Sequence, residues 1–209
     1  MPQVVRSAHL DVRKLRSRPP LSQTLGLMNK IAIDPIEVQF GLVHDCIRAC
    51  VYADHIHQVP NKKDAWLSIM DMCYSDAIMS WNTIFGTNSQ ETHWKKLATA
   101  LPVPKQSQLK PFSKAMITDY LNISDGEWNE YYKRMVDFRN HRLAHFQHAI
   151  NEQEPPNITW ALHSAYLYRE WLLSLLREYQ TLGVKMKITK TSGADMLELF
   201  KKQIEELCK

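Results

Sequence analysis

Apolar residues recur at intervals of three and four along almost the whole chain, which is the period of an amphipathic α-helix. The stretch from Trp66 to Trp81 illustrates it, with further apolar residues at positions 69, 70, 73 and 77. The 209 residues include only six glycines, and the helical period leaves little room for a β-sheet. We therefore predict an all-α fold, an up-and-down helical bundle.

Capping signals and prolines divide this pattern into individual helices. Asp34 followed by Pro35 is a good N-cap and predicts a first helix over 34–58. Asn61 is expected to cap a second helix, which ends near Gly86. Capping-box spacing predicts a short helix after Asn88 and Glu91, and a long helix over 128–146 after Ser124 and Glu127. Further helices are expected over 112–121, 158–182 and 192–209.

Length and charge indicate how these helices are organised. A chain of this size suits one domain, which we place at 31–209, preceded by a basic arm at 1–30. The arm could follow a phosphate backbone, but a solvated tail or a segment packed across the bundle is the favoured interpretation. The net charge of +4 permits contact with nucleic acid without requiring it.

The cysteines and the hydropathy pattern bear on the compartment. Cys46, Cys50, Cys73 and Cys208 show neither the close pairs of a zinc site nor the density of a disulfide scaffold. Cys46 and Cys50 share a helix face and are expected in the core. No apolar run has the length of a membrane span, and the first residues lack the pattern of a signal peptide. We expect a cytoplasmic protein without a membrane partner.

Arg139 interrupts the apolar face of the predicted helix over 128–146. A helical wheel places it among the apolar residues at positions 128, 132, 135, 136, 143, 146 and 150. A buried charge costs several kcal/mol unless a partner replaces its hydration. A core aspartate could be that partner, and Asp45, Asp71 and Asp76 lie on neighbouring predicted helices. A bound phosphate is the other interpretation, because Arg142 and His145 follow within about 120° of the helix surface.

The segment around Arg139 resembles a known signature. Arginine, a polar residue and, after five intervening positions, a histidine resemble the Arg-x4-6-His signature of the HEPN superfamily, small all-helical proteins of which many are metal-independent ribonucleases. A second stretch is similar to the abortive-infection (AbiU-type) branch of that superfamily. The two stretches are Phe138-Arg139-Asn140-His141-Arg142-Leu143-Ala144-His145-Phe146 and Ser80-Trp81-Asn82-Thr83-Ile84-Phe85-Gly86 with Glu91-Thr92-His93-Trp94.

The resemblance covers roughly residues 66–180 and carries structural and functional expectations. It implies a four-helix core with extra N- and C-terminal helices, and a homodimer in which two copies of the motif share one cleft. It also implies an RNA substrate, no cofactor, and an antitoxin protein as a partner. HEPN toxins silenced by tyrosine modification carry His-x-Tyr, whereas this chain has Phe146 and Gln147 after the histidine, so that control is not expected here.

The residue types of the motif suit RNA cleavage without a metal ion. In that reaction the 2′-hydroxyl of RNA attacks the adjacent phosphate, which requires proton transfer and positive charge around the phosphate. His145 is the expected acid or base, since the unperturbed pKa of histidine is about 6.5. Arg139 is expected to bind the scissile phosphate, with Asn140 orienting the site and Arg142 as an auxiliary phosphate contact.

Two other interpretations remain open. His141, His145 and His148 lie on one side of the predicted helix with Asp137 one turn before, which could form a metal site, although no second helix offers an obvious pair of ligands. The stronger alternative is a non-catalytic HEPN-like module that binds RNA, a nucleotide or a protein partner. We expect no metal and no cofactor. His93, beside Trp94, is expected to serve packing rather than chemistry.

Overall fold

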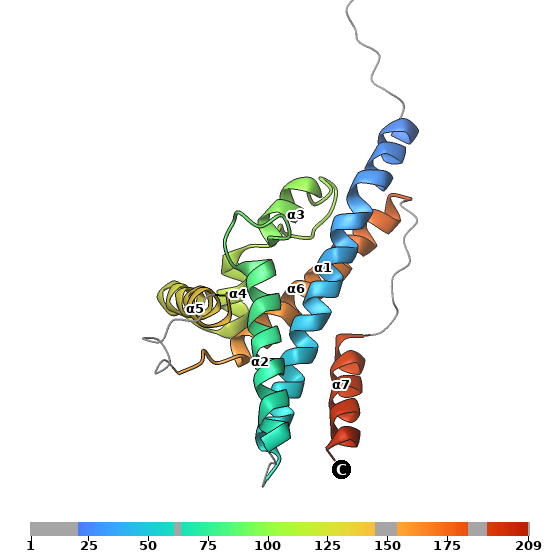
Figure 1. Cartoon of the computed structure of the whole chain (residues 1–209). Coiled ribbons are helices and arrows are strands. Elements are labelled where there is room, and N and C mark those ends of the chain that lie inside the picture. The colour runs from blue at the N-terminus through green and yellow to red at the C-terminus, as the bar shows by residue number, and fades with distance from the viewer. Residues whose placement is uncertain (1–20, 61–63, 145–153, 184–191, 209) are drawn as a thin grey trace, which may run out of the picture.

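The computed structural model describes residues 21–60, 64–144, 154–183 and 192–208, with only the backbone described for 21–35 and 142–144. All regular elements in these ranges are helical, which confirms the all-α prediction (Figure 1). Within these ranges, no helix has both the length and the apolar character needed to cross a membrane. The elements are α1 (Leu21–Gln58), α2 (Asp64–Phe85), α3 (Trp94–Ala100), α4 (Lys114–Leu121), α5 (Asp125–Phe138), the π-helix η2 (Arg139–Ala144), α6 (Thr159–Thr181) and α7 (Gly193–Leu207).

Helix α1 is the central element of the bundle. It runs antiparallel to α2, and α6 and α7 also pack against it (Figure 1). Its inward face is completely buried at Val43, Cys46 and Ile47, and Cys50 is 1% exposed. The prediction that Cys46 and Cys50 are core residues is therefore confirmed.

The start of α1 differs from the prediction. Asp34 and Pro35 were expected to begin the helix, but α1 begins at Leu21, so both lie within it. The predicted boundary at residue 30 also falls inside this helix, while residues 1–20 of the predicted arm lie outside the described residues. Leucine, methionine, lysine and alanine precede Pro35 and favour the helical conformation, and the helix continues despite the lost backbone donor and the crowding of the proline ring against the preceding turn.

The helix caps match the predictions in part. Ser124 and Glu127 form the predicted capping box, in which the Ser124 Oγ accepts from the Glu127 N–H at 3.2 Å and Glu127 Oε2 accepts from the Ser124 N–H at 2.7 Å. Helix α2 ends at Phe85, immediately before Gly86, as predicted. The box at Asn88 and Glu91 is wrong, because α3 begins later and is capped by the side chain of His93.

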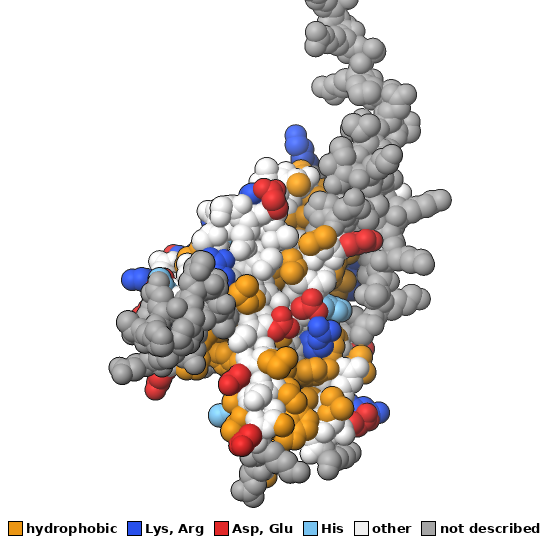
Figure 2. Space-filling model, viewed as in Figure 1, with side chains coloured by type: hydrophobic (Ala, Val, Ile, Leu, Met, Phe, Trp, Pro, Cys, Tyr) orange, Lys and Arg blue, Asp and Glu red, His pale blue; other side chains and the backbone are white. Residues whose placement is uncertain are grey.

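The first half of α2 is less buried than its apolar period predicts. Ile69 and Met72 are 39% and 70% exposed, and the first buried residue of the helix is Ala77. Figure 2 shows apolar side chains gathered on the face where the lower parts of α1 and α2 lie. Helices α5 and α6 cover the second half of α2, where the aromatic core is located.

The aromatic core fixes α5 against α2 and α6. The Trp81 side chain is completely buried, and its ring centroid lies 5.9 Å from that of Trp128 and 5.6 Å from that of Tyr131. Its indole Nε1–H donates to the Ser164 Oγ on α6 at 2.9 Å. Trp81 therefore joins α5 to α6 through a buried ring whose only donor is satisfied.

We expect Gly86→Ala to lower the free energy of unfolding by about 1–3 kcal/mol, because an added methyl group overpacks a closed site. A Cβ atom there would lie 2.3 Å from the Asn82 carbonyl oxygen and 3.0 Å from the Asn82 Oδ1. The control is Gly41→Ala on the exposed side of α1, where a Cβ meets nothing within 4 Å. That change should stabilise the protein by about 0.5–1 kcal/mol. Urea unfolding followed by circular dichroism checks both values, and equal effects would contradict the close approach at Gly86.

Candidate functional site

The predicted motif begins where the backbone changes from α- to π-helix. Helix α5 ends at Phe138, and residues Arg139–Ala144 form η2. The predicted continuous α-helix is therefore wrong from Arg139 onward. A π-turn closes hydrogen bonds five residues apart, so a helical wheel of 3.6 residues per turn no longer applies. The predicted angle of about 120° between Arg139 and His145 loses its basis.

The buried stripe of α5 is also displaced from the prediction. Trp128, Tyr131, Met135 and Phe138 are buried, whereas Tyr132 and Val136 are only partly buried. Arg139 follows this stripe and is itself half-buried, so it lies at the edge of the core and not in the middle of an apolar face. Its side chain can reach solvent or a ligand from there.

Amide oxygens hold the Arg139 guanidinium. Its Nε and Nη2 donate to the Asn140 Oδ1 at 3.0 and 2.7 Å. The Gln90 amide is assigned with its nitrogen towards the carbonyl oxygens of Asn82 and Thr83, at 2.8 and 2.9 Å. In that orientation the Gln90 Oε1 accepts from the Arg139 Nη1 at 3.0 Å. The guanidinium is therefore oriented by two neutral groups.

The aspartates proposed as ion-pair partners lie elsewhere. Asp45 pairs with Arg48 at 2.7 Å, Asp76 accepts from the Ser80 hydroxyl at 3.5 Å, and Asp71 lines a separate cavity. Among the described residues, none of the ion pairs within 4.0 Å involves Arg139. Within that part of the chain, the structural ion pair is not formed and the charge of Arg139 has no carboxylate to balance it.

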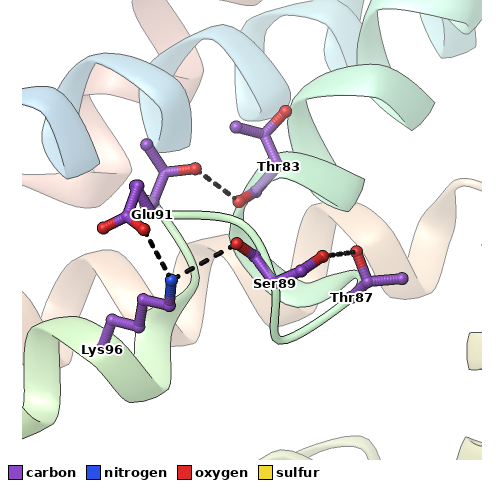
Figure 3. Close-up of polar contacts among 6 residues, drawn as sticks. Thr83, Thr87, Ser89, Glu91 and Lys96 are labelled. Carbon is purple, nitrogen blue, oxygen red and sulfur yellow. Dashed lines mark hydrogen bonds and ion pairs between the residues drawn. The ribbon is translucent and has the colours of Figure 1, made fainter.

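The loop between α2 and α3 places Gln90. Figure 3 shows its internal bonds: Lys96 Nζ donates to the Ser89 carbonyl oxygen at 3.3 Å and to Glu91 Oε1 at 2.9 Å, and the Thr87 and Ser89 hydroxyls lie 3.1 Å apart. The Thr92 hydroxyl donates to the Thr83 carbonyl oxygen at 2.9 Å, which ties the loop back to α2. Sequence reasoning missed Gln90, because nothing local marks a loop glutamine as the partner of an arginine 49 positions away.

Asn82 connects α2 to the start of the π-helix. Its side chain is completely buried, and its Nδ2 donates to the Ile78 carbonyl oxygen at 2.9 Å and to the Met135 carbonyl oxygen at 3.1 Å. The Met135 carbonyl also accepts from the backbone N–H of Arg139. Asn82 therefore supports the backbone at the point where α5 gives way to η2.

The remaining motif residues are described only in part. Arg142 belongs to η2, but its side chain and all of His145 lie outside the described residues. His141 is in η2 and is half-buried. Of the metal-site alternative, His145 and His148 also lie outside the described residues. Among the residues that the structure describes, no group of three or more His, Cys, Asp or Glu residues is arranged to hold a metal ion.

His93 serves packing, as predicted. It is 2% exposed, its Nδ1 accepts from the Lys95 N–H at 3.2 Å, and its ring stacks on Trp94 with centroids 5.7 Å apart. Burial, with a smaller contribution from the Lys95 charge, lowers its pKa to about 4. It is therefore neutral at pH 7 and acts as the N-cap of α3.

A cavity of about 440 Å³ between α1, α2 and the start of α6 does not suit a phosphate. Its lining includes the carboxylates of Asp54 and Asp71, together with Tyr74 and Phe138. Negative walls repel an anion. Arg139 and Asn140 do not line this cavity.

Comparisons of the chain with family models, with curated proteins and with solved structures find no match. The resemblance to HEPN proteins therefore rests on the residues quoted above. The geometry adds a positively charged group at the beginning of that motif, oriented by amides and next to a π-turn. π-turns occur frequently at functional sites.

We expect protonation of His93 to destabilise the protein at acid pH. Its pKa is about 4 when folded and about 6.5 when unfolded, so below pH 6.5 the unfolded chain binds the proton more readily. The free energy of unfolding should fall by about 2–3 kcal/mol as the pH is lowered from about 6.5 to about 4. Well above pH 6.5, His93 is neutral in both the folded and the unfolded state, so it should cause no further change with pH. His93→Asn keeps an acceptor for the cap and should flatten that slope in urea unfolding across this range. An unchanged slope would assign the acid sensitivity to other groups.

Proposed function

We propose that the chain is a metal-independent endoribonuclease of HEPN type that acts as a homodimer through the Arg-x5-His motif of Arg139 and His145. The observation that carries this proposal is the state of the Arg139 guanidinium, which Asn140 and Gln90 orient without neutralising. A planar cation of this kind suits bidentate binding of a phosphate.

The contact between the two HEPN-like stretches supports the same proposal. The Asn82 side chain of the first stretch donates to the backbone carbonyl of Met135, three residues before the second stretch begins at Phe138. Gln90, in the loop after the first stretch, binds Arg139 itself. The segments that carry the resemblance are thus neighbours in space, as parts of one site must be.

In the proposed mechanism, Arg139 binds the scissile phosphate and stabilises the charge that develops as the 2′-hydroxyl attacks. His145 transfers a proton, Asn140 holds Arg139 in place, and Arg142 contacts a neighbouring phosphate. A homodimer would supply a second imidazole, so that one acts as base and the other as acid. Such an enzyme acts where cellular RNA is found, which favours a cytoplasmic toxin or phage-defence protein restrained by an antitoxin.

Cleavage of a mixed RNA pool in excess EDTA tests the proposal. Arg139→Ala and His145→Ala should each lose about 10²–10⁴ in rate, the usual contribution of a positioned catalytic group. Arg177→Ala, which changes an exposed arginine near the end of α6, should cleave like the wild type. Circular dichroism confirms that each variant is folded. If neither the wild type nor any of the three variants cleaves RNA but the wild type still binds it, the ribonuclease proposal is wrong. The non-catalytic binding module would then take its place.

Asn140→Asp separates a binding role of Arg139 from a structural one. The carboxylate has the shape of the amide and can accept the same two bonds, but it neutralises the guanidinium. We expect the folded protein to be at least as stable, while affinity for single-stranded RNA falls about tenfold or more, the size of one charge-assisted bond. Fluorescence anisotropy and urea unfolding measure the two effects. Unchanged affinity would mean that Arg139 does not contact the RNA.

A further inference from the structure

A second hollow, of about 200 Å³, opens beside the loop that holds Arg139. It lies between the end of α2 and helices α3, α4 and α5. Four aromatic side chains line it: Trp94 and Tyr132 are partly exposed, whereas Trp128 and Phe85 are only 5% and 2% exposed. Its volume is below the roughly 300 Å³ at which sites for drug-sized molecules begin, so it suits a single flat ring system.

The aromatic walls are held in place before any ligand arrives. Trp128 packs on the buried Trp81 ring, and Trp94 meets Phe112 edge to face with centroids 5.3 Å apart. The Tyr132 hydroxyl donates to the Gly86 carbonyl oxygen at 2.9 Å. Rings that are already ordered lose little entropy when a ligand binds between them.

The rim of the hollow is polar and carries two lysines. Lys95 Nζ lies 5.4 Å from the centroid of the Trp94 ring. Lys114 Nζ lies 2.9 Å from Asp125 Oδ2 and donates to the Asn129 Oδ1 at 3.2 Å. Asn88 adds an exposed amide. Both lysines are engaged with neighbours, so aromatic surface and amides, more than free charge, characterise this hollow.

The hollow and Arg139 share one loop. Gly86, Asn88 and His93 line the hollow, and Gln90 of the same loop binds the Arg139 guanidinium. Tyr132 lines the hollow and also lies close enough to Arg139 to feel its charge. Burial raises the pKa of Tyr132, and the Arg139 charge opposes that rise. Tyr132 precedes Arg139 by two helical turns, about 10 Å along the axis, which a short piece of nucleic acid can span.

We propose that this hollow binds one unpaired nucleobase of the RNA strand whose phosphate lies on Arg139. The inference rests on the proposed function for the phosphate, but base binding is a separate property. Single-stranded RNA is recognised through unstacked bases that lie against aromatic rings and form hydrogen bonds along their edges. The partly exposed rings of Trp94 and Tyr132 supply the stacking surface, and Asn88 and Asn129 supply donors and acceptors for the base edge.

Abasic substitution tests the hollow without requiring catalysis. Short single-stranded RNAs with methylated 2′-hydroxyls cannot be cleaved, because the nucleophile is blocked. Each RNA in the series lacks the base at one position, and its affinity for the full chain is measured by anisotropy in EDTA. We expect one position at which loss of the base weakens binding about 5- to 150-fold, which corresponds to stacking of one base.

Variants assign that effect to the hollow. Trp94→Ala should abolish the difference between the complete and the abasic RNA, and Trp94→Phe should restore part of it. Trp66→Ala, which changes a half-buried tryptophan of α2 outside the hollow, should keep the full difference. Asn88→Ala alters an exposed side chain and should change which base is preferred at that position, which keeps the test informative if Trp94→Ala does not fold.

The outcomes distinguish the two proposals. No position-dependent loss in the wild type, or equal losses for Trp94→Ala and Trp66→Ala, would overturn the nucleobase site. Base discrimination without cleavage of unmodified RNA would overturn the ribonuclease and leave the nucleobase site standing. Cleavage of RNA without any dependence of affinity on a single base would overturn the nucleobase site and leave the ribonuclease standing. Absence of any RNA binding would overturn both proposals.

Discussion

The burial of the Trp81 indole, where α2, α5 and α6 meet, determines the geometry of the candidate site. The ring is packed against Phe85, Trp128 and Tyr131, and its N–H is satisfied by Ser164. An indole without that partner would leave a buried donor unsatisfied, which costs about 1–3 kcal/mol. With α5 packed on this ring, the start of the π-helix lies beside the α2–α3 loop, where Gln90 binds Arg139.

The chain contains a second arginine that shows what a structural ion pair looks like in this fold. Arg169 on α6 is completely buried, its Nη1 lies 2.6 Å from the Glu170 Oε1, and its Nε approaches the His44 Nε2 at 3.4 Å. Burial first, and the Arg169 charge second, lower the pKa of His44. Arg139 differs on both counts, being half-buried and held by amides. The proposed role of Arg139 in binding a phosphate requires this contrast, because a guanidinium that is already neutralised by a carboxylate has less to gain from an anion.

The sequence predicted those parts of the structure that depend on neighbouring residues. The all-helical class, the Ser124 cap and the end of α2 at Gly86 follow from local propensity and capping chemistry. The π-helix and Gln90 did not follow, for a common reason. The widened turn begins at a carbonyl that Asn82 supports from another helix, and Gln90 is brought to Arg139 by the folding of a distant loop. A helical wheel contains neither interaction.

The same loop connects the two chemical features of the site. Hydrogen bonds within the loop and to its neighbouring helices hold it in place (Figure 3). One end of the loop lines the aromatic hollow, and Gln90 in its middle binds the Arg139 guanidinium. A phosphate contact alone gives affinity without sequence preference, whereas a base pocket alone gives preference with little affinity. With both attached to one rigid segment, a base that fits the hollow would fix the register of the strand on Arg139, so sequence preference would follow from the spacing between the two.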